Sequence, residues 1–201
     1  MHLNRKLMLF AIAPVVFAAI PGTAWLIGRD SIGTAKAPAA ANLRLVADLS
    51  DRRLKMFEAD TLVWQYPISP GTPSYPTPAG EYKIRRLVWN PSWTPPPNAE
   101  WARKYTAKEP GEPANPMKVV KIFFREPDYF IHGTGETYKL GEAASHGCLR
   151  MDPEHIAEVA KYVMEHGGQP REESWFWRVL HFRSEEKPII LKNPIPLTIK
   201  T

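Results

Sequence analysis

Proline makes up 21 of the 201 residues, about twice the average usage of ~5%, and no other feature restricts the folding of this chain as much. A proline inside a helix removes a backbone hydrogen bond and clashes with the preceding turn. We therefore expect strands, turns and ordered loops over most of the chain. The hydrophobic fraction of 44% is enough for a packed core and excludes a wholly disordered protein. A single cysteine excludes a disulfide framework.

Residues 1–29 form a hydrophobic N-terminal segment typical of export. Arg5 and Lys6 precede a stretch, residues 7–28, that contains no charged residue. This stretch is long enough to span a bilayer, but Pro21 shortens its apolar core to the length of a cleavable signal. A signal peptide and a membrane anchor both remain open. We expect a linker over residues 30–42 and an exported folded domain over 43–201, in the periplasm or at the outer face of the cytoplasmic membrane and the cell wall.

Short apolar runs between turn residues predict that this domain is mainly β. The first three runs are separated by tight turns, and the fourth follows a loop rich in proline and glycine. The expected strands are residues 43–49, 53–57, 61–68, 81–89, 119–124 and 129–132. The tail alternates poorly from residue 175 onward, and its last two apolar runs, 188–191 and 197–199, are expected to be edge strands.

One clear α-helix is expected after Asp152. Asp152 is a good N-cap, and Pro153 is favoured at the first helical position. The apolar residues that follow share one helical face: Ile156, Val159, Ala160, Val163 and Met164. The pair Gly167 and Gly168 then ends the helix.

Residues 90–118 show no clean period and are rich in proline and tryptophan. A loop of this length in a compact domain is usually a lid or a binding loop, or it is disordered, and its aromatic residues argue against disorder. We expect a lid beside a functional site. A structural excursion packed on the core and a proline-rich ligand segment are the alternatives.

The only cysteine lies among residues that suit nucleophilic catalysis. Cys148 directly follows Gly147, two residues after His146 and sixteen after His132. A thiol nucleophile needs a partner that favours thiolate, backbone N–H groups directed at the developing oxyanion, and access. His132 could act as the base, and the N–H groups of Gly147 and Cys148 could bind the oxyanion.

A metal site is the other interpretation of these residues. His132, His146 and Cys148 could supply three zinc ligands with an open fourth position. Their spacing matches no common zinc pattern, and a catalytic carboxylate is not obvious, although Glu136 and Glu142 are near in sequence.

Residues 132–134 (His-Gly-Thr) and 145–151 (Ser-His-Gly-Cys-Leu-Arg-Met) closely resemble the signature of the L,D-transpeptidases of the YkuD family. The resemblance extends upstream to residues 46–54 and to the Thr-Pro-Ala-Gly loop at 77–80. It departs at Leu149, where isoleucine or valine is more frequent. The resemblance implies a β-sandwich-like catalytic domain over residues 43–201.

The resemblance also assigns catalytic roles. Cys148 would be the nucleophile, and His132 would be the proton donor and acceptor, oriented by the backbone carbonyl of Gly133. His146 and Gly147 would shape the oxyanion pocket together with the amide of Cys148. No metal and no cofactor is implied.

The implied substrate is a tetrapeptide stem of peptidoglycan, with Arg150, Ser145 and Thr134 as candidate substrate-binding residues. Release of the terminal D-Ala would leave an acyl-enzyme. An amine of a second stem would then give a 3-3 cross-link, a lysine of a wall-anchored protein would attach that protein, and water would give an L,D-carboxypeptidase or a cross-link hydrolase. A non-catalytic wall-binding module is the alternative from another class. The net charge of +5, without a basic run, does not indicate a nucleic-acid partner.

Overall fold

The computed structural model describes residues 43–201. The expected signal peptide or anchor at 1–29 and the linker at 30–42 lie outside the described residues. Within residues 43–201 no helix is both long enough and apolar enough to cross a membrane.

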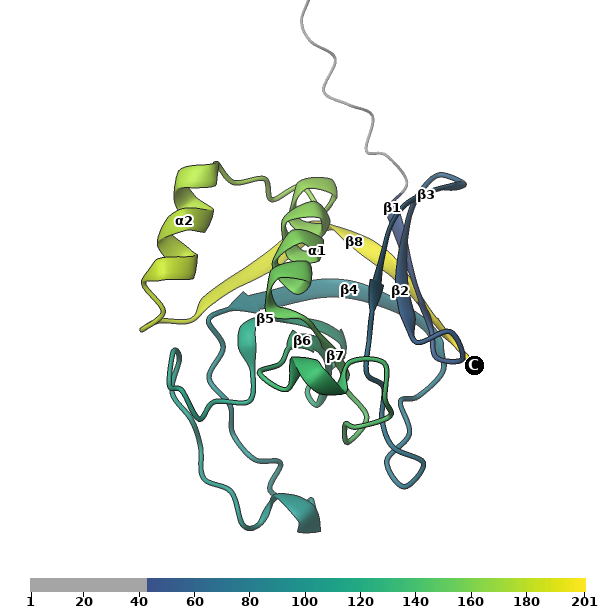
Figure 1. Ribbon diagram of the computed structural model, residues 1–201. Coiled ribbons are helices and arrows are strands. Elements are labelled where there is room, and N and C mark those ends of the chain that lie inside the picture. Colours follow the sequence, from purple (N-terminus) through teal and green to yellow (C-terminus); the bar gives the residue numbers. More distant parts are fainter. Residues whose placement is uncertain (1–42) are drawn as a thin grey trace, which may run out of the picture. The chain divides into compact units, whose positions relative to one another are not determined.

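The described residues form one eight-stranded sheet, and the mainly β architecture expected from the sequence is confirmed (Figure 1). The strand order is β3-β2-β1-β8-β4-β5-β6-β7, in which only the pairs β1–β8 and β6–β7 are parallel. The strands are β1 (Leu43–Asp48), β2 (Arg53–Glu58), β3 (Thr61–Pro67), β4 (Gly80–Trp89), β5 (Lys118–Arg125), β6 (Tyr129–Gly133), β7 (Leu149–Met151) and β8 (Lys187–Lys200).

The C-terminal strand corrects the sequence prediction. Instead of two edge strands, the structure has one continuous strand, β8, in the middle of the sheet between β1 and β4. Its odd-numbered apolar residues face the core: Ile189, Leu191, Ile195, Leu197 and Ile199. At its centre the register with β4 shifts, and the N–H groups of Lys192 and Asn193 donate to the carbonyl of Gly167 instead of a strand. The interval between the two predicted strands, 188–191 and 197–199, is therefore an irregularity within one strand, as is typical of a bulge.

Two α-helices occur in the described part, whereas the sequence predicted one. The predicted helix is α1 (Pro153–His166), and it carries the expected apolar face. The additional helix is α2 (Glu173–His181), which buries Phe176 and Val179. The sequence did not indicate this helix, because three aromatic residues follow one another at positions 175–177 and show no helical period. In the structure Trp175 and Phe176 pack inward, whereas Trp177 is exposed.

The helix α1 joins the two ends of the sheet in one core, and Figure 1 shows it over β4 and β8. On one side it packs against β5 and β6. On the other side its Glu158 accepts a hydrogen bond of 2.8 Å from Tyr66 on β3. The strand pair β6–β7, which holds the site described below, is thereby fixed against the buried face of α1.

The N-cap of α1 gives a direct test of this local structure. The Asp152 carboxylate accepts hydrogen bonds from the N–H groups of Glu154, at 2.8 Å, and His155, at 3.4 Å. Asp152→Ala removes both acceptors, so we expect the free energy of unfolding to fall by about 1 kcal/mol in chemical denaturation. Asp152→Asn keeps an equivalent cap and should stay within a few tenths of a kcal/mol of wild type. Equal stability of Asp152→Ala and wild type would contradict the capping role.

Candidate active site

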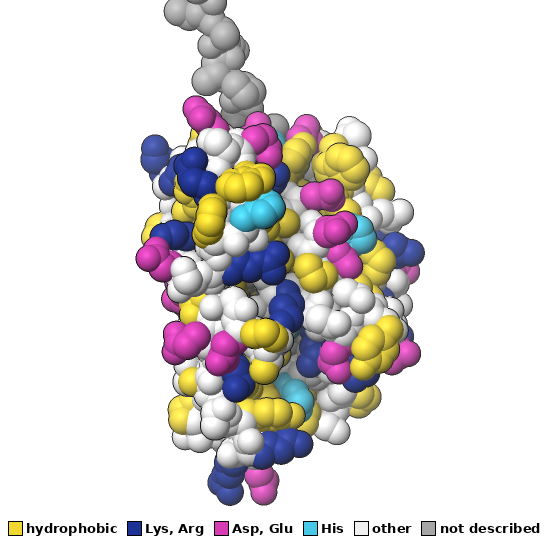
Figure 2. Space-filling model, turned by 60° about the vertical axis from the view of Figure 1, so that its left-hand side comes forward, with side chains coloured by type: hydrophobic (Ala, Val, Ile, Leu, Met, Phe, Trp, Pro, Cys, Tyr) yellow, Lys and Arg dark blue, Asp and Glu magenta, His cyan; other side chains and the backbone are white. Residues whose placement is uncertain are grey.

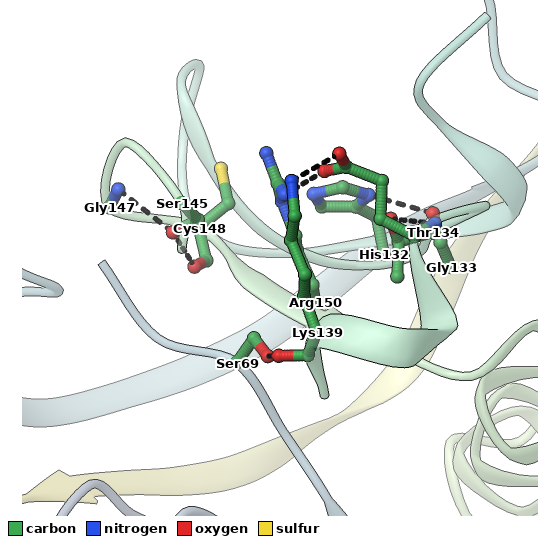
Figure 3. A network of polar contacts seen from close by, with 10 residues as sticks. Ser69, His132, Gly133, Thr134, Lys139, Ser145, Gly147, Cys148 and Arg150 are labelled. Carbon is green, nitrogen blue, oxygen red and sulfur yellow. Dashed lines mark hydrogen bonds and ion pairs between the residues drawn. The ribbon is translucent and has the colours of Figure 1, made fainter. Parts of the chain in front are cut away.

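Neighbouring strands place two rows of side chains on one face of the sheet. In the first row Lys121 on β5 lies opposite His132 on β6, which lies opposite Arg150 on β7. Residues two positions apart in a strand point to the same face, so Phe123, Phe130 and Cys148 form a second row beside the first. Cys148 directly precedes β7 and packs against the Phe123–Phe130 pair. Figure 3 shows Cys148, Arg150 and His132 on the same side of the strands.

The loop before β7 presents the thiol through a specific backbone conformation. Gly147 has φ +107°, and a Cβ atom there would lie 2.8 Å from the Tyr129 ring, so a side chain at this position is excluded. Ser145 is 2% exposed; its hydroxyl donates to the Cys148 carbonyl at 2.5 Å and accepts from the Gly147 N–H at 3.1 Å. The Gly147 amide expected in the oxyanion pocket thus already has a partner in the protein.

His132 is held in a single tautomer. Its Nδ1 lies 2.9 Å from the Gly133 carbonyl oxygen, which can only accept, so Nδ1 carries the proton and Nε2 has the free lone pair. This is the contact expected between His132 and Gly133. The side chain is 3% exposed, and burial lowers the pKa of His132 to about 3. The imidazole is therefore neutral at physiological pH and has the form that a general base needs.

Cys148 is protonated in this resting arrangement. Burial raises the pKa of its thiol to about 11, although the Phe130 N–H and the charges of Lys121 and Arg150 act in the opposite direction. The thiol donates to the carbonyl oxygen of Asp128 at 3.4 Å. Cys148 and His132 are thus both neutral at rest and do not form a thiolate–imidazolium ion pair.

Arg150 is neutralised within the protein. Its guanidinium binds the carboxylate of Glu136 at 2.7 Å, and Lys139 binds the same carboxylate at 2.7 Å. Thr134 is 4% exposed, donates its backbone N–H to Met151, and accepts the Glu136 N–H at its hydroxyl. Glu136 and Lys139, absent from the expected site, therefore belong to the same network as Arg150 and Thr134.

A cavity of about 890 Å³ lies over this face and is lined by Cys148, His132 and Arg150. Residues 90–118 contribute to its lining, including Trp93, Trp101 and Tyr105. The long proline-rich segment therefore borders the site, as expected of a lid or binding loop. The Trp101 ring stacks on His146 with centroids 3.9 Å apart and planes at 14°.

The zinc interpretation finds no matching geometry. Among residues 43–201 no group of three or more His, Cys, Asp or Glu side chains is arranged to hold a metal ion. His146 instead contacts two aromatic side chains: in addition to the Trp101 stack, the Tyr75 ring lies tilted against it with centroids 4.7 Å apart.

Lys121 is a cavity residue that the sequence did not predict. It lies opposite His132 and lines the cavity, yet no motif contains it. The one feature of the sequence that could have indicated Lys121 is that it is the only charged residue in the apolar run Val119–Phe124, whose other members are all buried. A lysine at such a position requires a polar environment on one face of its strand.

The family model of the L,D-transpeptidase catalytic domain, YkuD, matches residues 42–175, which is more than half of the chain. This protein belongs to that family. A relative from Fuscovulum blasticum that bears an L,D-transpeptidase name is 34% identical over 138 residues, covering 68% of both chains. A Bacillus licheniformis relative with the same kind of name is 29% identical over 120 residues, covering 60% of this chain and 59% of its own length. The chain thus spans less than two thirds of some relatives that it matches.

Solved structures support the fold. The L,D-transpeptidase from Mycobacterium smegmatis matches with a TM-score of 0.50 and 15% identity, over 80% of this chain and 59% of that one. The Enterococcus faecium L,D-transpeptidase matches with a TM-score of 0.51 and 13% identity, over 79% of this chain and 50% of that one. At these identities the likeness concerns the fold alone.

Proposed function

We propose that this protein is a peptidoglycan L,D-transpeptidase that acts outside the cytoplasm through a cysteine acyl-enzyme. The observation that carries the proposal is the placement of Cys148 and a neutral, singly tautomeric His132 on one face beneath a large cavity. Nucleophile, base and an orienting group for the base are the parts that covalent acyl transfer requires. Membership in the YkuD family supports the same activity.

The first half-reaction follows from the protonation states at rest. As Cys148 Sγ attacks the carbonyl of the third stem residue, its proton passes to Nε2 of His132. The backbone N–H of Cys148 is our proposed donor to the resulting oxyanion. When the intermediate collapses, the C–N bond breaks, His132 returns the proton to the nitrogen, and D-Ala leaves. A thioester on Cys148 remains.

The second half-reaction is the reverse process with a new amine. The acceptor amine loses a proton to His132 as it attacks the thioester, the C–S bond breaks, and Cys148 regains its proton. Burial disfavours a charged imidazolium, so the proton stays on His132 only briefly, and this suits a residue that must both take and give it. The acceptor is a stem amine, a lysine of a wall-anchored protein, or water in an L,D-carboxypeptidase or hydrolase.

The electrostatics and the domain limits agree with this proposal. Stem peptides carry carboxylates, and Figure 2 shows a face on which Lys and Arg side chains run down the middle along a hollow.

We propose that residues 43–201 form the catalytic unit, because β8 completes the centre of the sheet. Residues 1–29 would then direct the protein to the membrane or through it, and 30–42 would link the two parts.

A product assay tests this function. The protein is mixed with a purified disaccharide-tetrapeptide, and products are followed by mass spectrometry. We expect a dimer that has lost one D-Ala. Loss of D-Ala without a dimer would establish the carboxypeptidase instead. An unchanged substrate, with Cys148 still open to alkylation, would contradict both.

The aromatic stack over the cavity gives a second testable consequence. Trp101→Ala removes the stack on His146, an interaction worth about 0.5–1.5 kcal/mol, so the loop should cover the cavity less often. We expect kcat/KM to fall by roughly 2- to 12-fold. Limited proteolysis within residues 103–109 should become faster. Trp64→Ala, at an exposed position on β3, is the matched control and should change neither.

A further inference from the structure

Four cationic side chains line the cavity: Arg86, Lys108, Lys121 and Arg150. Three of them have carboxylate partners within the protein: Arg86 with Glu126 at 2.6 Å, Arg150 with Glu136 at 2.7 Å, and Lys108 with Glu112 at 3.9 Å. Among the described residues, Lys121 has no carboxylate within ion-pair distance. It is therefore the cation of this cavity that remains available to a ligand.

The surroundings hold Lys121 in place without neutralising it. Its ammonium donates to the carbonyl oxygen of Ser92 at 2.7 Å and lies 4.9 Å from the centroid of the Phe130 ring. The charge of Glu186 acts on Lys121 without a direct contact and favours its charged form, while the Glu186 carboxylate itself accepts from the N–H and hydroxyl of Ser92. Burial lowers the pKa of Lys121, since the charged form is poorly solvated. A half-buried ammonium that has no carboxylate partner among residues 43–201 is stabilised by an incoming anion.

The sheet register fixes where such an anion would bind. Lys121 lies directly opposite His132, and in an antiparallel pair the two Cα atoms are about 4.5–5.5 Å apart. In the proposed reaction His132 protonates the nitrogen of the departing D-Ala. The carboxylate carbon of that residue is two bonds from the same nitrogen, or about 2.5 Å. Arg150, on the other side of His132, is already paired with Glu136.

We propose that Lys121 binds the C-terminal carboxylate of the donor stem and thereby restricts the donor to peptides that end one residue beyond the scissile bond. This inference rests on the proposed function. It makes Lys121 a specificity residue that contacts the leaving group, and it gives the departing D-Ala an anchor during attack by Cys148. A donor whose terminal carboxylate is replaced by a neutral amide loses this contact.

The test compares two donors on the full-length protein in detergent: a disaccharide-tetrapeptide ending in D-Ala, and the same compound ending in D-alaninamide. The kcat/KM for release of the terminal residue is measured for each. A hydrogen bond to a charged partner predicts a preference of about tenfold or more for the free acid in the wild-type protein. Lys121→Met should reduce the ratio of the two kcat/KM values toward one, mainly because kcat/KM for the free-acid donor falls. Lys121→Arg keeps the positive charge and should retain most of the preference.

Lys83→Met is the matched control, since it removes the same charge from an exposed position on β4 outside the cavity, and it should keep the wild-type ratio. Equal turnover of acid and amide by the wild-type protein would overturn the inference even if Lys121→Met did not fold. An unchanged ratio in a folded Lys121→Met would overturn it as well. Turnover of neither donor by the wild-type protein would count against the proposed function itself, so the two failures are distinct.

Discussion

Replacing Cys148 with alanine is expected to abolish acyl transfer and to leave the protein folded. The substitution removes the only thiol of the chain, and no other described nucleophile lies in its row on the sheet. The Cys148 side chain packs at the edge of a small apolar cluster, where an alanine methyl group fits. D-Ala release from a disaccharide-tetrapeptide should fall to background, while the melting temperature stays near that of wild type.

Cys148→Ser is the informative companion to this variant. It keeps a hydroxyl in the same position but a far weaker nucleophile, and His132 can still accept its proton. We expect turnover near background for Cys148→Ser too. Substantial D-Ala release by a folded Cys148→Ala protein would contradict the acyl-enzyme mechanism outright.

Replacing His132 with glutamine has the second-largest expected effect. Loss of general acid–base catalysis predicts that kcat falls by about 10²- to 10⁴-fold. Because base and nucleophile act as a unit, the double variant with Cys148→Ala should be no worse than Cys148→Ala alone. His181→Gln, at an exposed position on α2, is the matched control and should keep wild-type turnover.

The pH dependence of the alkylation rate of Cys148 distinguishes this mechanism from one that starts from a thiolate–imidazolium ion pair. Alkylation needs thiolate, whose fraction rises with pH through the raised pKa of about 11. The rate in wild type should therefore keep rising well above pH 9. Since His132 is neutral at rest, His132→Gln should change this profile little while turnover collapses. A wild-type rate that levels off below pH 7 would indicate a thiolate–imidazolium pair instead.

Most of the sheet could be predicted from the sequence because its strands alternate cleanly or are short apolar runs between turns. The strand β8 could not, since Lys192 and Asn193 interrupt its apolar pattern at the place where its N–H groups turn to Gly167. Its position was equally hidden, because β1 and β8 pair although about 150 residues separate them along the chain.

The candidate site was predictable in part. The sequence motif predicted that Cys148 and His132 belong to one site, and the structure places them on one face of the sheet. Lys121 entered the site only through the register of β5 against β6, and Glu136 only through its ion pairs with Arg150 and Lys139. Register and ion pairing depend on the folded backbone, which a motif does not describe.

The most direct test of the account is the intact mass of the protein after mixing with a disaccharide-tetrapeptide and quenching in acid, where a thioester survives. The account predicts an adduct equal to the substrate minus D-Ala, located by peptide mapping on the fragment that contains Cys148 and absent from Cys148→Ala. An adduct on another residue, or D-Ala release that persists in a folded Cys148→Ala protein, would contradict it.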